Sequence, residues 1–98
     1  MDVIHVVQGI TFTWGRRKAV ANLGKHGVPF ETACEVFFDP FLQLVGEQEK
    51  DGELREAVIG MTKGWRLLVV AFVIRAETVR IISARTARPS ERERYEDN

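Results

Sequence analysis

The stretch Trp65–Ile74 limits the folds open to this chain more than any other segment. All of its residues except Arg66 are apolar, and valine is frequent among them. The stretch is far shorter than the ~20 apolar residues that cross a bilayer. It therefore predicts a strand in the middle of a sheet that is covered on both faces. A chain of 98 residues can supply that cover from one core, so we expect one domain over residues 1–98.

The segments before this strand predict a short strand followed by two helices. Ile10–Trp14 alternates bulky apolar residues with threonine, which is typical of a strand. Arg16–His26 carries apolar residues at helical spacing, and Gly27 supplies a left-handed cap that ends the helix. Phe30–Phe38 predicts a second helix, which ends before Asp39-Pro40.

After Pro40 the apolar residues recur every second position, which is typical of strands. The predicted strands are Leu42–Gly46, Arg55–Met61, Trp65–Ile74 and Val79–Thr86. They are joined by an acidic loop (Glu47–Glu53) and turns at Thr62-Lys63-Gly64 and Arg75–Thr78, and a short helix over Ser90–Tyr95 follows. The predicted class is α+β, with two N-terminal helices packed on an antiparallel β-meander and a short C-terminal helix.

Charge is segregated along the chain although the formal net charge is zero. Residues 1–30 and 57–98 are net basic, whereas residues 31–56 are strongly acidic. Zero net charge therefore leaves a polyanionic ligand open if the basic groups gather on one face, and ordinary solvated surface charge is the alternative. The single cysteine, Cys34, excludes an internal disulfide and fits a reducing cytoplasm.

Four segments, taken in order and at their spacing, resemble the BrnT family of ribonuclease toxins. The first reads F-x-W, then K-A-x-x-N-L-x-K-H-G-V-x-F-E-x-A, and comprises Phe12, Trp14, Lys18, Ala19, Asn22, Leu23, Lys25, His26, Gly27, Val28, Phe30, Glu31 and Ala33. The second, V-F-x-D-P, comprises Val36, Phe37, Asp39 and Pro40. The third, R-x-x-x-I-G before G-x-R-L-L-x-V, comprises Arg55, Ile59, Gly60, Gly64, Arg66, Leu67, Leu68 and Val70. The fourth, I-R-I-I-S-A-R leading to E-R-x-x-Y-E, comprises Arg80–Arg85, Glu91, Arg92, Tyr95 and Glu96, with Val79 in place of the first isoleucine.

The sequence also departs from the pattern of that family. Gly15 stands where an acidic residue usually follows the tryptophan, and Pro29 replaces a usual serine. Residues 1–9 precede the usual start and are either a frayed extension or an added strand. The resemblance implies a RelE-like ribonuclease fold and toxicity through RNA cleavage. It also implies a BrnA-type ribbon-helix-helix antitoxin, and operator DNA would be bound only through that antitoxin. The two proteins could form a heterotetramer, and a homodimer of this chain is also possible.

Cleavage of RNA without a metal needs a base for the 2′-hydroxyl, cations for the phosphorane oxygens and an acid for the leaving oxygen. We expect no metal site and no cofactor, because His5, His26 and Cys34 are isolated from one another in the sequence. His26 is the candidate base because imidazole is the side chain best suited to accept a proton near neutral pH, while capping the helix is its structural alternative.

Arg66 and Arg85 are the candidate phosphate-binding pair. If Ile74 faces Val79 across the last hairpin, Leu68 faces Arg85 and the two guanidinium groups share one face. A register shift of one residue would remove this arrangement, and surface ion pairs are the alternative. Arg80 would then point to the opposite face, where it contacts RNA, forms a salt bridge or meets the helices.

The remaining candidates each have a structural alternative. Tyr95 is the candidate acid or a base-stacking group, or else it pins the C-terminal helix to the sheet. Lys18 and Lys25 either hold phosphates or are simply solvated. Trp14 and Trp65 fit core or rim packing better than a platform for bases. Asn22 either bonds locally or faces the cleft.

Two functions compete at this level. The first is an endoribonuclease toxin that inhibits translation and growth. The second is a toxin-like binding module that has lost catalysis and acts as a co-repressor with its antitoxin, a reading that zero net charge, Gly15 and Pro29 favour slightly. We expect the acidic segment Glu47–Glu53 to lie away from RNA or to meet a basic part of the antitoxin.

Overall fold

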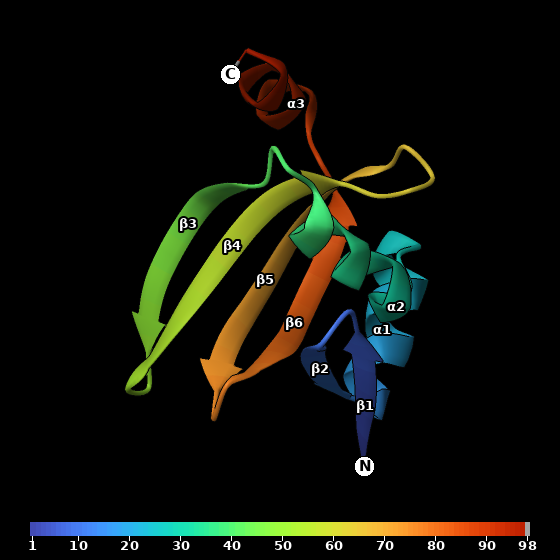
Figure 1. Ribbon diagram of the computed structural model, residues 1–98, viewed down its shortest axis with the longest axis vertical. Helices are drawn as coiled ribbons and strands as arrows, with labels where there is room; N and C mark the ends of the chain where they lie inside the picture. Colours follow the sequence, from blue (N-terminus) through green and yellow to red (C-terminus); the bar gives the residue numbers. More distant parts are fainter. Residues whose placement is uncertain (98) are drawn as a thin grey trace.

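The computed structural model describes residues 1–97 and shows a curved mixed sheet with helices at its side and at one end (Figure 1). The chain forms the strands β1 (Asp2–Val7) and β2 (Ile10–Gly15), then α1 (Arg16–His26), α2 (Phe30–Ala33) and the 3-10 helix η1 (Cys34–Phe38). The strands β3 (Gln43–Lys50), β4 (Glu53–Met61), β5 (Leu67–Arg75) and β6 (Thr78–Thr86) follow, and α3 (Pro89–Glu96) ends the described chain. The α+β class is confirmed.

Both predicted helices form, but two strands precede them. The helix α1 has the predicted bounds, and Gly27 ends it with a φ of 69° and an N–H that donates to the Leu23 carbonyl at 2.9 Å. The second helix is α2 running directly into η1. Residues 2–7 form an added strand that pairs with β2, so the helices are not N-terminal, contrary to the prediction. Within residues 1–97 no helix is long and apolar enough to span a membrane.

The predicted antiparallel meander describes only part of the sheet. The strand order is β1-β2-β6-β5-β4-β3, and consecutive strands from β3 to β6 are antiparallel. The strand β2, however, lies parallel to β6, with Phe12 opposite Val79 and Thr13 opposite Arg80. The sheet is therefore mixed, because α1, α2 and η1 carry the chain away from β2 before the meander begins.

The acidic segment is part of a hairpin and not the loop that we expected. Residues 47–50 continue β3 and pair with β4, and only Asp51 and Gly52 turn the chain, both with positive φ. This end of β3 is exposed, so its charged side chains face water and its acidic composition does not oppose strand formation.

A bulge in β6 changes the register that we predicted for the last hairpin. Ile74 does face Val79, as expected. The pairing then shifts between Ala71 and Phe72, so that Arg85 lies opposite Val69 and not opposite Leu68. Because successive strand residues point to opposite faces, this shift moves the Arg85 side chain to the other side of the sheet.

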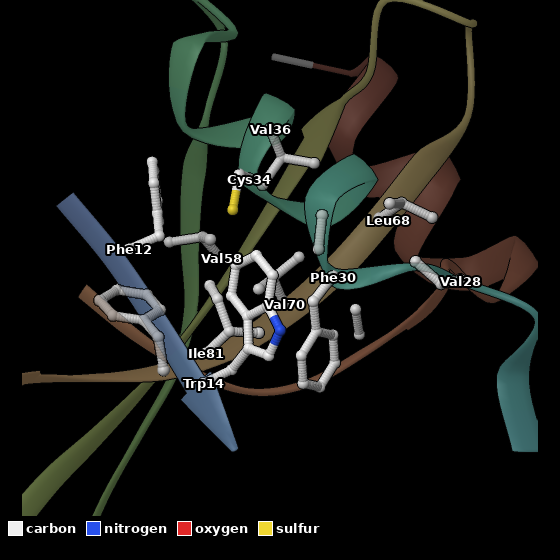
Figure 2. Close-up of a cluster of buried hydrophobic side chains, with 13 residues drawn as sticks. Phe12, Trp14, Val28, Phe30, Cys34, Val36, Val58, Leu68, Val70 and Ile81 are labelled. Carbon is white, nitrogen blue, oxygen red and sulfur yellow. The ribbon is translucent and has the colours of Figure 1, made fainter. Parts of the chain in front are cut away.

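The main core lies between the sheet and the helices α2 and η1. Figure 2 shows Phe12, Trp14 and Phe30 around aliphatic side chains of the sheet, with Cys34 on the helical side. Trp14 is 2% exposed, which confirms its predicted packing. Burial raises the pKa of the Cys34 thiol to about 12, so this side chain packs as an apolar group.

Gly60 allows η1 to lie directly on β4. A Cβ added at Gly60 would stand 2.9 Å from both Cβ and the carbonyl oxygen of Val36. The opposite face of the sheet carries a smaller buried cluster, Ile59, Leu67 and Val69, against which Tyr95 of α3 packs.

Candidate functional site

Three of the predicted site residues lie together along a shallow groove between α1 and β6. Lys18, Lys25 and His26 line this groove with Asn22, and Ser83 of β6 forms part of its floor. The four helical residues share one side of α1 because residues three, four and seven apart lie on one face of a helix. The sequence therefore gathers a histidine and two lysines at one surface.

Asn22 fixes α1 to β6 at this groove. The strand β2 pairs with β6 at Val79 and Arg80, which leaves the Ala84 backbone beyond the reach of β2. The Asn22 side chain takes its place: its Nδ2 donates to the carbonyl oxygens of Ala84 at 2.9 Å and Val28 at 3.1 Å, and its Oδ1 accepts from the Ala84 N–H at 3.1 Å. Asn22 is 7% exposed, so it is a buried structural residue that orients its neighbours on α1.

Arg66 reaches the same end of α1. One of its Nη atoms donates to the carbonyl oxygen of Gly27 at 3.4 Å, directly after His26. Within the part of the chain that the structure describes, no carboxylate lies within salt-bridge distance of Arg66. The guanidinium thus retains donors for an anion near the C-terminal end of α1.

Arg85 lies elsewhere, so the predicted convergence with Arg66 is wrong. Its guanidinium forms a bidentate pair with Glu91, at 2.7 and 2.8 Å, on the side of the sheet under α3. The hydrogen bond from Arg85 lowers the pKa of the Glu91 carboxyl to about 2. The bulge in β6 is the physical reason, because it turns Arg85 away from the face to which Leu68 points.

Tyr95 makes the structural contact that was its alternative. Its hydroxyl donates to Oδ2 of Asp39 at 2.5 Å, which ties α3 to the turn after η1. Burial, followed by the contact with Asp39, raises the pKa of the Tyr95 hydroxyl to about 12. Asp39 also accepts the N–H groups of Phe41 and Met61, so it joins η1, β4 and α3.

Arg80 forms the salt bridge that was one of its alternatives. Its two Nη atoms donate to the Asp2 carboxylate at 3.0 and 3.2 Å, and this hydrogen bonding lowers the pKa of that carboxyl. The pair ties the added strand β1 to β6. Arg80 therefore does not line the groove of Lys18, Lys25 and His26.

Two features of this surface were missed by reasoning from the sequence. Asp39 was interpreted only as the end of a helix before proline, although an aspartate in V-F-x-D-P can accept several hydrogen bonds. Trp65 was expected to pack, but its side chain is 82% exposed. Its neighbours Gly64 and Lys63 in a predicted turn were the available signal.

Within residues 1–97, no three histidine, cysteine, aspartate or glutamate side chains are grouped closely enough to hold a metal ion. Cationic side chains along α1, packed against a small mixed sheet, are typical of the class of proteins that bind a polyanion.

Comparison with known proteins identifies the family. The sequence profile of a family described as "Ribonuclease toxin, BrnT, of type II toxin-antitoxin system" matches residues 14–91, so the chain belongs to this family of ribonuclease toxins. The crystal structure of the ribonuclease toxin BrnT from Brucella abortus is similar, with a TM-score of 0.61 and 27% sequence identity. The match covers 76% of this chain and 92% of the Brucella chain. Among curated proteins none matches. The strand β1 lies outside the residues that the family profile matches.

Proposed function

We propose that this chain cleaves RNA at the end of α1, in the angle between α1, β6 and the loop that carries Arg66. The observation that supports this site is the guanidinium of Arg66, which has no carboxylate partner within residues 1–97 and donates to the carbonyl of Gly27, the residue after His26. A phosphodiester is the group in RNA that such a fork of donors recognises.

In this proposal His26 accepts the proton of the 2′-hydroxyl as its oxygen attacks phosphorus. Arg66 donates to the phosphorane oxygens, whose charge grows in the transition state. Lys18 and Lys25 hold flanking phosphates along α1. As the 2′-oxygen bonds to phosphorus, the P–O5′ bond breaks and the leaving 5′-oxygen takes a proton from water, so one strand ends in a 2′,3′-cyclic phosphate and the other in a 5′-hydroxyl. No metal or cofactor takes part in this proposal.

Arg85 and Tyr95 act in this proposal as positioning residues and not as catalytic residues. Their partners, Glu91 and Asp39, fix α3 to the sheet and to the turn after η1. Tyr95 is a poor acid for the leaving oxygen because its pKa is raised and its proton is shared with Asp39. Arg80 stabilises β1 and does not bind RNA.

The type II system to which the family belongs contains an antitoxin. We propose that this antitoxin is of the BrnA type, with a ribbon-helix-helix domain, and that operator DNA is contacted only by the antitoxin. The proposed complex is cytoplasmic and contains two copies of each chain. We also propose that the toxin fold is RelE-like. The exposed acidic hairpin, around Glu47 and Glu49, offers charge complementary to a basic segment of such a partner.

The test is incubation of the purified, antitoxin-free protein with a defined RNA, with and without a chelator. Cleavage that survives the chelator and yields cyclic phosphate ends is expected. His26→Ala should slow cleavage by about 10²–10⁴-fold, the usual contribution of a general base. Lys50→Ala, which removes an exposed cation at the far end of β3, is the matched control and should leave the rate unchanged. Intact RNA at a large excess of folded protein would favour the binding module and co-repressor in place of the enzyme.

A further inference from the structure

Trp65 has a conformation and an exposure that packing does not explain. Its φ is 63°, in the left-handed region that glycine adopts more readily than a bulky residue. Its side chain is 82% exposed, so it gains little from burial in the folded chain. The backbone conformation costs stability and burial of the indole does not offset that cost, so this residue is a candidate for function.

The loop that carries Trp65 is held in place by backbone hydrogen bonds. The Thr62 N–H donates to the Arg66 carbonyl at 2.9 Å, and the Trp65 N–H donates to the Thr62 carbonyl at 3.1 Å. The Arg66 N–H donates to the Thr62 hydroxyl at 3.0 Å, and the Lys63 N–H donates to a Glu35 carboxylate oxygen at 2.9 Å. The indole is thus presented by a fixed turn, which lowers the entropic cost of binding a ligand.

The surroundings of the indole suit a flat, partly polar ligand near a phosphate. Trp65 lines a mainly apolar groove with Phe41, Tyr95 and Lys63. The groove also contains the carboxylates of Glu35 and Asp39, which already accept hydrogen bonds from the chain itself. The next residue in the chain is Arg66, whose side chain turns the other way, toward Gly27 and the end of α1. An exposed indole and a guanidinium with no carboxylate partner within residues 1–97 therefore belong to neighbouring residues, and the exposed Lys63 lines the same groove as the indole.

We propose that Trp65 is a stacking platform for an unpaired nucleobase of the RNA, next to the phosphate that Arg66 binds. This inference rests on the proposed function, because it assigns a second part of the same RNA-binding surface. The flanking cations favour a nucleotide over an apolar protein segment, since a base carries its own phosphates beside it.

The test compares two substitutions that relieve the same backbone strain. Trp65→Gly removes the indole at a φ of 63°, and Glu77→Gly is the matched control at a φ of 65° in the turn between β5 and β6. Neither should lower the melting temperature, because glycine adopts both conformations readily. Trp65→Phe keeps an aromatic ring and should retain most of the affinity.

Binding is measured with a 2′-O-methyl RNA oligonucleotide, which lacks the attacking hydroxyl, and with an abasic sugar–phosphate polymer of equal length. Trp65→Gly should bind the RNA about 5- to 150-fold more weakly, the range found for one stacked base, and Glu77→Gly should bind as the parent does. On the abasic polymer the parent and Trp65→Gly should be equal. The parent's tryptophan fluorescence should be quenched by the RNA only, because Trp14 is buried and Trp65 is exposed.

Two results would overturn the platform while leaving the proposed function intact. The first is that Trp65→Gly binds and cleaves RNA with the affinity and rate of the parent. If this variant also loses its binding to the antitoxin, the indole belongs to the interface with that protein and not to the RNA-binding surface. The other is an equal loss of affinity for RNA and for the abasic polymer. A parent that neither binds nor cleaves RNA would instead contradict the proposed function, and the platform with it.

Discussion

Asn22→Ala should destabilise the protein more than any other single substitution of a polar residue on α1. The change removes three hydrogen bonds and leaves the N–H and carbonyl of Ala84 and the carbonyl of Val28 without their partner. An unsatisfied buried group costs about 1–3 kcal/mol. Because the groove beside α1 admits water to part of this site, we take the lower value for each group and expect a loss of about 3 kcal/mol.

A loss of this size is a large part of the ~5–15 kcal/mol that stabilises an ordinary domain. For a domain of this length it corresponds to a fall in melting temperature of roughly 12–24 °C. Urea denaturation measures the free energy directly, and hydrogen exchange at the Ala84 amide reports the local bond. Val20→Ala is the matched control, because Val20 is 68% exposed on the same helix and its truncation should cost less than ~0.5 kcal/mol.

The result that would refute this reasoning is a loss below about 1 kcal/mol with an unchanged exchange rate at Ala84. Asn22 would then be an incidental neighbour of β6, and α1 would be held by its apolar contacts. RNA cleavage should fall with the substitution at temperatures where the variant remains folded, because Asn22 orients the side of α1 that carries the candidate base and the two lysines.

Three other substitutions test the packing and the ion pairs. Gly60→Ala places a Cβ 2.9 Å from a backbone oxygen of η1 and should cost about 1–3 kcal/mol in urea denaturation. Glu91→Gln should make the free energy of unfolding less dependent on pH in acid. The Glu91 carboxyl is paired with Arg85 and its pKa is lowered to about 2, so it stabilises the fold fully above its ordinary pKa of 4.5 and loses that effect as pH falls toward about 2. An acid limb between pH 5 and 2 identical to that of the parent would contradict it. Tyr95→Phe removes the hydroxyl bonded to Asp39 and should cost about 1–2 kcal/mol, with faster proteolysis of α3, and unchanged protection of α3 would speak against that link.

The sequence predicted well those features that depend on neighbouring residues. The helix Arg16–His26 and its glycine stop follow from apolar spacing and from a residue that tolerates positive φ, and the structure has the same bounds. The predicted central strand Trp65–Ile74 forms for the same local reason, although it begins at Leu67 and ends at Arg75, which leaves Trp65 and Arg66 in the preceding loop. The acidic segment 47–53 was predicted as a loop because it lies outside the core, where no apolar alternation marks it as strand.

Features that depend on distant contacts were not accessible. A single bulge in β6 determines the face of the sheet on which Arg85 lies, and the residues around Ile82 give no sequence signal that predicts the bulge. The role of Asn22 depends on a partner 62 positions away in the sequence. The parallel pairing of β2 with β6 likewise depends on the path of the chain through the helices. For these reasons only the structure shows that the two arginines are apart, with Arg66 at the carbonyl of Gly27 and Arg85 paired with Glu91.

The central claim is that Arg66, and not Arg85, binds the phosphate that is cleaved. Single-turnover cleavage of one RNA by Arg66→Ala and Arg85→Ala tests it directly, at a temperature where circular dichroism shows both variants to be folded. We expect a rate about 10²–10³-fold lower for Arg66→Ala at unchanged stability, by analogy with the loss of one donor to a transition-state oxyanion. For Arg85→Ala we expect lower stability and a rate within a few-fold of the parent. Equal losses of rate in the two folded variants, or full activity in Arg66→Ala, would contradict the account.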